Sequence, residues 1–412
     1  MSKITSIEGR ILFNSRGSKT IEVDIKSDGQ FLGRVCAPSG ASVGKYEAVS
    51  FPNEKPEESL RILKENSKKF VGLESSDLKA IHDTLKSLDD SSNYSKIGGS
   101  LAFAVTIASM ESASKALGQP LFQTLSSESS FKCPFPLGNI LGGGAHAGPG
   151  TPDIQEILIC ATGSKTIEEA IETNLAVHKE LRRVLEKEDP NFTNGRGDEG
   201  GWAPKLENQK ALEVSVKACE NLGFTLGKEV SLGVDFASST QWNEEKQKYL
   251  YDRAGFENST GEQIDFAADI IEKFKLIYAE DAVHEEAFED MSELTAKFPN
   301  VLITGDDLTV TNKDILTKAI DSKSCNAAIL KVNQAGSLHD ALEFANEANQ
   351  NNIRLITSHR SGESIDSQIS HIGLATKSKM LKVGVVGGER VAKLNELLRL
   401  SGHDLIRGMA EI

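Results

Sequence analysis

The feature that most restricts the fold of this sequence is a series of short apolar runs, each ending in a charged side chain and separated from the next by a helical pattern. In KFPNVLITGDDLTVTN (298–313), a Val-Leu-Ile run precedes Gly305 and two adjacent aspartates. The other runs in this part of the chain are VSLGVD, KLIYAED, AAILK, IRLITSHR and MLK. Such alternation indicates parallel strands joined by crossover helices. We therefore predict a TIM-type α/β barrel.

A different pattern precedes the barrel. The segments KITSIEGRILF and TIEVDIKSDGQFLGRVCA alternate apolar and polar residues, with an Asp-Gly turn between two of the strands, as in an antiparallel meander. Three helical patterns follow it. The chain has 412 residues, a length typical of two domains. We expect a smaller N-terminal α+β domain over residues 1–128 and a catalytic α/β barrel over residues 129–412, joined through SSESSFKC.

Charged or titratable residues stand at the ends of six successive strands of the predicted barrel. In chain order they are Asp235, Glu280 with Asp281, Asp306 with Asp307, Lys331, His359 with Arg360, and Lys382. The C-terminal ends of barrel strands meet at one rim, where catalytic groups lie. One such charge is as readily a solvated loop start, but six in succession favour a shared site.

Three carboxylates, those of Asp235, Glu280 and Asp306, would meet at this rim with no cysteine in the pattern. Hard oxygen ligands favour Mg²⁺ over zinc, and three protein ligands leave coordination positions for a substrate. An ion-pair network with lysines is the alternative, although three anions around one centre repel one another unless a cation lies between them. We therefore expect a magnesium site.

Lys331 and Lys382 belong to the same rim. A lysine close to other cations is shifted toward its neutral form, which is a base. A base of this kind beside Mg²⁺ could remove a proton alpha to a carboxylate while the metal stabilises the resulting dianion. The alternative for either lysine is an ion pair with a neighbouring acid.

Two glycine-rich loops carry further candidates. NGRGDEGGWAP (194–204) matches G-x-G-x-x-G, but it lacks the flanking strand and helix of a dinucleotide site. We interpret it as a tight loop that presents Glu199 as a carboxyl acid, with a surface turn as the alternative. GGGAHAGPG (142–150) contains His146, and its glycines allow the backbone to approach a ligand closely. A lone histidine is more often structural.

Two other segments suggest phosphate binding. SHRSGES places Arg360 beside Ser361, and planar guanidinium donors next to a hydroxyl form a good phosphate clamp. An ion pair between Arg360 and a rim acid is the alternative. APSGASVGKYEA (37–48) departs from a phosphate loop at two positions, and its glycines and serines suggest a mobile lid.

Composition excludes several classes of function. The formal net charge of -14 disfavours nucleic acid and anionic membranes as partners. The sequence has no membrane-spanning apolar stretch and its start lacks the apolar core of a signal peptide. Its five scattered cysteines, without CxxC, fit a reduced cytoplasmic setting. A surface or secreted second role is not excluded by any motif.

Taken together and in order, these motifs resemble those of the enolase (phosphopyruvate hydratase) family. The segments that carry the resemblance are NSRGSKTIEVD, APSGASVGKYEA, GGGAHAG with DIQE, GDEGGWAP, GVDFASS, YAED, GDDLTVTN, LKVNQAGS, SHRSGE and ERVAKLNELLR. The sequence departs from the family at several positions, among them Asn14 in place of the usual Asp and a shorter segment after Lys382. None of these is an expected ligand or acid–base group.

The resemblance implies a Mg²⁺-dependent, reversible dehydration of 2-phosphoglycerate to phosphoenolpyruvate, in which a lysine base works beside one or two Mg²⁺ ions. Asp235, Glu280 and Asp306 would bind the first Mg²⁺, and Ser42 would help to hold a second that arrives with substrate. Lys331 would be the base, and Glu199 the acid with Glu156 beside it. His146, Gln155, His359, Arg360, Ser361 and Lys382 would complete the substrate pocket. The family also implies a homodimer or a larger homo-oligomer.

Two other functions remain open at this point. The chain could act on another carboxylate, such as a sugar acid, although the SHRSGE clamp and the SGASVG lid favour a phosphorylated substrate. It could also be a non-catalytic binding protein on the same scaffold, although the acid, base and metal positions are all intact.

Overall fold

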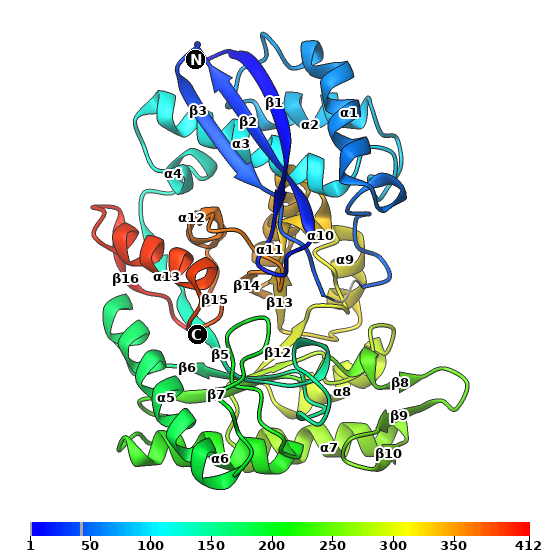
Figure 1. The fold of residues 1–412 in the computed structure, drawn as a ribbon, viewed down its shortest axis with the longest axis vertical. Helices are drawn as coiled ribbons and strands as arrows, with labels where there is room; N and C mark the ends of the chain where they lie inside the picture. Colours follow the sequence, from blue (N-terminus) through cyan, green and yellow to red (C-terminus); the bar gives the residue numbers. More distant parts are fainter. Residues whose placement is uncertain (1, 42–43) are drawn as a thin grey trace.

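The N-terminal part of the computed structural model is a three-stranded antiparallel sheet covered on one side by helices (Figure 1). The structure describes residues 2–41 and 44–412. The elements are β1 (Ile4–Phe13), β2 (Lys19–Ser27), β3 (Phe31–Cys36), α1 (Pro56–Asn66), α2 (Leu78–Lys86), α3 (Gly99–Leu117) and α4 (Leu121–Leu125). Neighbouring strands pair in antiparallel register, which confirms the predicted meander.

Close packing of α3 on the sheet depends on one glycine. A Cβ built on Gly33, in β3, would lie 1.8 Å from the backbone oxygen of Ala108 in α3. Only a residue without a side chain therefore lets the helix backbone approach the strand this closely. The same helix buries Leu101, Val105 and Ile107 against the sheet, so its apolar composition is explained by burial rather than by a membrane.

The larger part of the chain is a closed eight-stranded barrel, as predicted. Its strands, in the order in which they pair, are β11 (Tyr278–Glu280), β12 (Leu302–Gly305), β13 (Ala327–Leu330), β14 (Arg354–Ser358), β15 (Met380–Lys382), β5 (Phe135–Gly142), β6 (Glu156–Cys160) and β7 (Ser231–Asp235). Apolar side chains of its strands form one buried cluster, among them Leu158, Ile329 and Ile356. All six runs identified in the sequence form strands of this barrel.

One barrel strand departs from the expected parallel arrangement. β6 runs antiparallel to both β5 and β7. The glycine-rich loop leads from β5 directly into β6 with only a short 3-10 turn at Gly144–His146. A parallel neighbour requires a crossover of a dozen or more residues, usually a helix. Residues 143–155 form no helix that could return the chain to the other end of the barrel, so β6 pairs in the opposite direction.

The helices around the barrel form an outer layer (Figure 1). They are α5 (Ile167–Glu188), α6 (Asn208–Asn221), α7 (Thr260–Lys273), α8 (Phe288–Lys297), α9 (Lys313–Asp321), α10 (Val332–Ala335), α11 (Leu338–Gln350), α12 (Gln368–Ala375) and α13 (Gly388–Ser401). Two small sheets complete the fold: β8 (Trp242–Asn243), β9 (Lys248–Tyr251) and β10 (Phe256–Asn258) form one, and β4 (Phe131–Cys133) with β16 (Ile406–Met409) the other. Thr166 caps α5 by accepting a hydrogen bond from the Glu169 N–H.

The N-terminal part contacts the C-terminal ends of several barrel strands. Ser39 and Gly362 exchange two backbone hydrogen bonds, at 2.8 and 2.9 Å. Ala48 N–H donates to the Gln334 carbonyl at 2.8 Å. These contacts place the segment after β3 at the barrel rim that carries the predicted site. Among the described residues, no helix is both long and apolar enough to cross a bilayer.

Candidate active site

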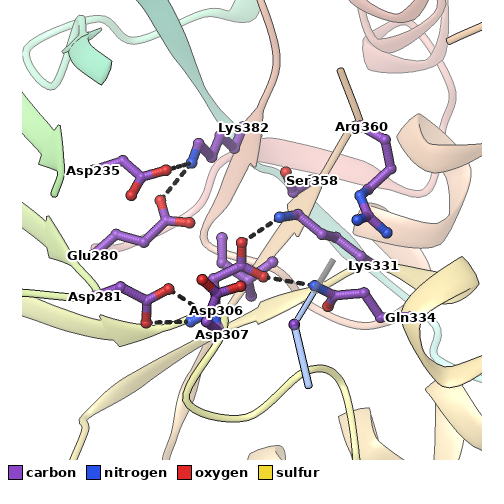
Figure 2. Close-up of polar contacts among 12 residues, drawn as sticks. Asp235, Glu280, Asp281, Asp306, Asp307, Lys331, Gln334, Ser358, Arg360 and Lys382 are labelled. Atoms are coloured by element: carbon purple, nitrogen blue, oxygen red, sulfur yellow. Dashed lines mark hydrogen bonds and ion pairs between the residues drawn. The ribbon is translucent and has the colours of Figure 1, made fainter. Parts of the chain in front are cut away.

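Lys382, at the end of β15, lies among the carboxylates of three other strands, and Figure 2 shows two of them, Asp235 and Glu280. Its Nζ is 2.9 Å from Asp235 Oδ2, 2.5 Å from Glu280 Oε2 and 3.4 Å from Glu156 Oε2. The parallel register of β7 and β11 sets Asp235 beside Glu280. Residues far apart in sequence therefore meet at one rim, as their positions at strand ends predicted.

A second cluster lies around Asp306, which follows β12. Lys331 Nζ donates to Asp306 Oδ2, and Gln334 Nε2 donates to Asp306 Oδ1 at 3.0 Å (Figure 2). Burial favours the neutral amine of Lys331, but the adjacent Asp306 outweighs it, and the net pKa of Lys331 is raised. The protein's own groups thus keep Lys331 charged, whereas the sequence analysis expected nearby cations to make it neutral.

Asp281 holds the backbone that carries these acids. Its Oδ1 accepts from the Asp306 N–H at 3.0 Å and its Oδ2 from the Asp307 N–H at 2.7 Å. Asp281 has a left-handed backbone with φ of 43°, a conformation that is costly for a residue with a side chain and is common at functional sites. Both carboxylate oxygens are thus engaged, so Asp281 orients its neighbours.

Negative charge exceeds positive charge in this part of the rim. Burial, reinforced by Asp235, raises the pKa of Glu280 well above its ordinary value, and burial with Asp306 raises that of Asp307 to about 8. Glu280 Oε1 is buried without a hydrogen-bond partner. Carboxylate oxygens of Glu280, Asp281 and Asp306 lie within 4.8 Å of one another. An all-oxygen, acid-rich set with an unpaired oxygen fits a hard divalent cation.

On the other side of Lys382 a second group of titratable residues lies close together. His146 Nδ1 is 3.0 Å from Glu156 Oε1, at ion-pair distance but off the line of a hydrogen bond, and 3.8 Å from Glu199 Oε1. His359 Nε2 is 3.1 Å from Glu199 Oε2. Since Arg390 donates to His359 Nδ1 at 2.8 Å, the proton of that ring is on Nε2 and points to Glu199.

The charges of this group follow from burial and contact. Burial lowers the pKa of His359 to about 4, so this ring is neutral at pH 7. Burial also opposes the charged form of His146, but Glu199 and Glu156 raise its pKa to about 9. Burial and the neighbouring Glu199 raise the pKa of Glu156 to about 7. Burial would raise the pKa of Glu199 too, yet its histidine neighbours hold that pKa well below the usual range. Of these two histidines, His146 is the charged one.

Arg360, at the end of β14, faces an acid from the N-terminal part. Its NH1 and NH2 donate to the two Glu47 carboxylate oxygens at 3.1 and 3.2 Å. The neighbouring Ser361 Oγ is buried without a hydrogen-bond partner. Arg390, fully buried in α13, donates to the carbonyl oxygens of Arg360 and Ser361 at 2.5 and 2.6 Å. Arg390 of α13 thus fixes the backbone that follows β14.

Arg253 anchors the glycine-rich loop that carries His146. From the turn after β9, its NH1 donates to the Thr151 carbonyl at 2.9 Å, to Thr151 Oγ1 at 2.7 Å and to the Pro152 carbonyl at 2.9 Å. Its NH2 reaches the Gly144 carbonyl at 3.3 Å. One guanidinium therefore ties both ends of the loop together.

The structure brings nearly all the predicted site residues to one cavity. Its lining includes His146, Gln155, Glu156, Glu199, Asp235, Asp306, Lys331, His359, Arg360, Ser361 and Lys382. Glu280 lies beneath this lining, fully buried, and Ser42 lies outside the described residues. The sequence analysis placed Asp281 at a strand end but gave it no role, and it missed Gln334, Glu47 and Arg390 as parts of the site. Each of these last three stands within or next to a segment that it quoted, but none ends a predicted strand.

Comparison with known proteins agrees with this architecture. Residues 130–406 match the profile "Enolase, C-terminal TIM barrel domain", and residues 4–125 match "Enolase, N-terminal domain". The chain is 42% identical over 413 residues to a protein named enolase from Methanosphaera stadtmanae, with 100% of both chains covered. It is 40% identical to that of Methanothermobacter thermautotrophicus, covering 100% of this chain and 99% of the relative, and 38% identical to that of Archaeoglobus fulgidus, covering 96% of each.

Proposed function

Because the chain belongs to the enolase family, with both of its domains matched and full-length relatives, we propose that it interconverts 2-phosphoglycerate and phosphoenolpyruvate. In the forward direction a base takes the C2 proton, the electron pair forms the C2–C3 double bond, and the C3 hydroxide leaves as water. The observation that carries the proposal is one cavity lined by Lys331, the Glu156–Glu199 pair and buried carboxylates.

We propose Lys331 as the base. Lys331 lines the cavity. Burial, Arg360 and Lys382 act to lower its pKa, but Asp306 outweighs them and the pKa is raised. The lysine takes the C2 proton as the free amine, so its neighbours set the fraction that is ready to react. Asp306 and Gln334 are linked by a hydrogen bond and fix the direction in which the lysine side chain points.

We propose that Glu156 and Glu199 together protonate the leaving hydroxyl. Burial and the neighbouring Glu199 give Glu156 a pKa of about 7, and Glu199 is held ionised. The pair therefore holds a proton in about half of the molecules at pH 7, as is favourable for a general acid. The leaving hydroxide takes this proton and departs as water. His146, at 3.0 Å from Glu156, stabilises the charge that remains on the pair.

Substrate binding is assigned to the cations and hydroxyl of the cavity. We propose that Arg360 and Ser361 bind the phosphate, since a guanidinium fork beside a hydroxyl matches its geometry. Lys382 faces the carboxylate of the substrate. Gln155 and His359 complete the pocket, and Gln155 Oε1 is buried without a hydrogen-bond partner.

The acidic cluster is assigned to Mg²⁺. Asp235, Glu280 and Asp306 would hold the first ion, with Ser42 as a ligand of a second that binds with substrate. When bound, Mg²⁺ supplies positive charge beside the substrate carboxylate and stabilises the additional negative charge formed there. The unpaired Glu280 Oε1 and the raised pKa of Glu280 support this assignment.

The test is turnover of 2-phosphoglycerate, followed as phosphoenolpyruvate absorbance, with Mg²⁺ and then with a chelator. We expect Mg²⁺-dependent turnover, and we expect Lys331→Ala to reduce it by about 10²–10⁴-fold. Lys179→Ala, which changes an exposed lysine of α5, serves as the control. Turnover of a sugar acid but not of 2-phosphoglycerate would contradict the proposal, and so would a Lys331→Ala variant with unchanged rate.

We also propose that two copies of the chain associate. Phe13 and Ile365 are 66% and 77% exposed. Phe13 ends β1, and the turn after it is joined to the loop of Ile365 where the Ser15 N–H donates to the Glu363 carbonyl at 2.8 Å. Exposed apolar side chains grouped in this way are typical of protein interfaces. Sedimentation of Phe13→Ser against Val71→Ser, a control on another exposed apolar residue, tests this; equal masses for wild type and Phe13→Ser would contradict it.

We propose a cytoplasmic location for the enzyme. All five cysteines are buried and unpaired, as is usual for proteins of reducing compartments. Fractionation of cells that produce the chain tests this directly, and recovery of the activity only outside the cytoplasm would contradict it.

A further inference from the structure

A second cluster of metal-ligating side chains lies where the N-terminal part meets the barrel. His82 comes from α2, and His339 and Asp340 come from the first turn of α11. None of the three lines the catalytic cavity. We infer that His82, His339 and Asp340 form a binding site for a borderline divalent transition metal of the Zn²⁺ type, which bridges the two parts of the chain.

The hydrogen bonds around His82 leave one ring nitrogen free to bind a metal. Ser337 Oγ donates to Asp340 Oδ2 at 2.8 Å, so its own proton is used there. His82 Nδ1 lies 3.2 Å from the same Oγ, and it must therefore be the donor. The proton of His82 is then on Nδ1, and the lone pair on Nε2 is available. Metal-binding histidines are usually oriented in this way through the second nitrogen.

The Nε2 lone pair faces other acceptor atoms. It lies 3.7 Å from Asp340 Oδ1, while Asp340 Oδ2 is occupied by the hydroxyls of Ser337 and of Tyr94, the latter at 2.6 Å. His339 Nδ1 lies 3.9 Å from the same Oδ1, and it is buried without a hydrogen-bond partner. Both separations are too long for hydrogen bonds, so the three atoms surround a point where positive charge would be favourable.

The distances are close to those of a metal site. Two ligand atoms of a tetrahedral Zn²⁺ ion, each about 2.0–2.1 Å from the metal, lie roughly 3.3–3.4 Å apart. The two measured separations exceed this by a few tenths of an ångström, and all three ligand atoms lie within 4.8 Å of one another. The rings of His82 and His339 are stacked with centroids 4.3 Å apart. His339 must therefore tilt to direct Nδ1 at the ion, and its 27% exposure leaves room for that movement.

The chemistry of the donors selects the ion. Two imidazole nitrogens and one carboxylate suit Zn²⁺ and its neighbours in the transition series, whereas Mg²⁺ prefers oxygen ligands alone. This site therefore prefers a different metal ion from the acidic cluster at the barrel rim. All three residues are partly exposed, so a water molecule can take the fourth position. A purely structural hydrogen-bonded cluster would instead bring these atoms within bonding distance, which the structure does not show.

Occupation of this site would fasten α2 to α11. The Leu338 N–H, one residue before His339, donates to Thr106 Oγ1 of α3 at 3.0 Å, so this end of α11 is already a point of attachment between the two parts. A metal held by residues from both α2 and α11 adds a cross-link that the unfolded chain lacks, and it stabilises the folded state by mass action.

The experiment measures Zn²⁺ bound per chain by equilibrium dialysis, with Mg²⁺ saturating, for wild type, His82→Gln and the control His403→Gln. We expect one more Zn²⁺ per chain in wild type and control than in His82→Gln. A hundredfold excess of Zn²⁺ over its Kd should raise the midpoint of thermal unfolding by about 3 °C in wild type and control, but not in His82→Gln. Equal Zn²⁺ content in wild type and His82→Gln would overturn the inference.

A second measurement guards against a misfolded variant. Co²⁺ bound to the wild-type protein, again with Mg²⁺ saturating, should give visible absorption bands of a tetrahedral nitrogen-containing site, and His339→Gln, which alters a more exposed ligand, should abolish them. Turnover of 2-phosphoglycerate with Mg²⁺ should be unchanged in both variants, so the outcome is independent of the proposed function. Bands that persist unchanged in His339→Gln would also overturn the inference.

Discussion

Replacement of Glu156 by glutamine gives a direct test of the charge balance described above. The Glu156 carboxyl is fully buried, and burial with Glu199 raises its pKa from 4.5 to about 7. A raised carboxyl pKa means that the folded state holds the proton more tightly than the unfolded state, so stability falls as pH rises from about 4.5 to about 7. At 1.36 kcal/mol per pKa unit the loss is roughly 3 kcal/mol at pH 8.

Glutamine has nearly the same shape and no charge, so Glu156→Gln should remove this loss. With a chelator present, we expect the variant to be up to about 3 kcal/mol more stable than wild type at pH 8 and nearly equal to it at pH 4.5. The figure is an upper value because His146, 3.0 Å from Glu156, loses an ion-pair partner. Urea unfolding from pH 4.5 to 8.5 measures the difference. A difference that does not change with pH, or a variant less stable at pH 8, would refute the reasoning.

Three further predictions concern the loop anchor, the sheet and the acidic cluster. Arg253→Leu should lower kcat/KM about 10- to 100-fold, since a displacement of about 1 Å in a catalytic loop has effects of this size. The control Arg407→Leu, at an exposed position of β16, should leave kcat/KM unchanged. Equal kinetics for the two variants would contradict the anchoring role of Arg253. Gly33→Ala should cost about 3 kcal/mol or more in urea unfolding because its Cβ meets a helix carbonyl, whereas Gly261→Ala, which meets nothing within 4 Å, should be nearly neutral. Mg²⁺ affinity, measured by calorimetry, should rise from pH 6 to pH 8 with release of protons, because the assigned ligand Glu280 has a pKa well above its ordinary value and must lose its proton as the cation binds. Affinity that falls over this range would contradict the assignment.

The sequence was sufficient to predict the barrel and its rim because both depend on local patterns. Each run such as VLITG is apolar for the length of one strand and ends in Gly or a charge, and the closure of parallel strands then brings their ends together. β6 was not predicted to run antiparallel. Its direction follows from the absence of a crossover helix in the loop that contains His146, and glycine-rich composition did not reveal that absence.

The pairing of charges could not be predicted, because it depends on contacts between distant segments. The sequence analysis left open whether Arg360 pairs with an acid, and expected that acid at the rim. The partner is Glu47, from the N-terminal part, which no strand pattern connects to β14. Likewise, Arg390 lies in a helix whose sequence is ordinary and amphipathic. Its role becomes visible only through its hydrogen bonds to the Arg360 and Ser361 carbonyls.

The charge balance of the cavity explains why an acid-rich protein can act on an anion. Arg360 is partly neutralised by Glu47, and Lys382 by Asp235 and Glu280. The protein alone therefore offers a phosphorylated carboxylate little net positive charge, and burial together with neighbouring acids raises the pKa values of Glu280 and Asp307. Such a site binds an anion well only if divalent cations enter with it. It follows that substrate affinity should depend on Mg²⁺ concentration more steeply than the stability of the fold does. Measurements of substrate binding and of thermal unfolding across Mg²⁺ concentrations would reveal this difference.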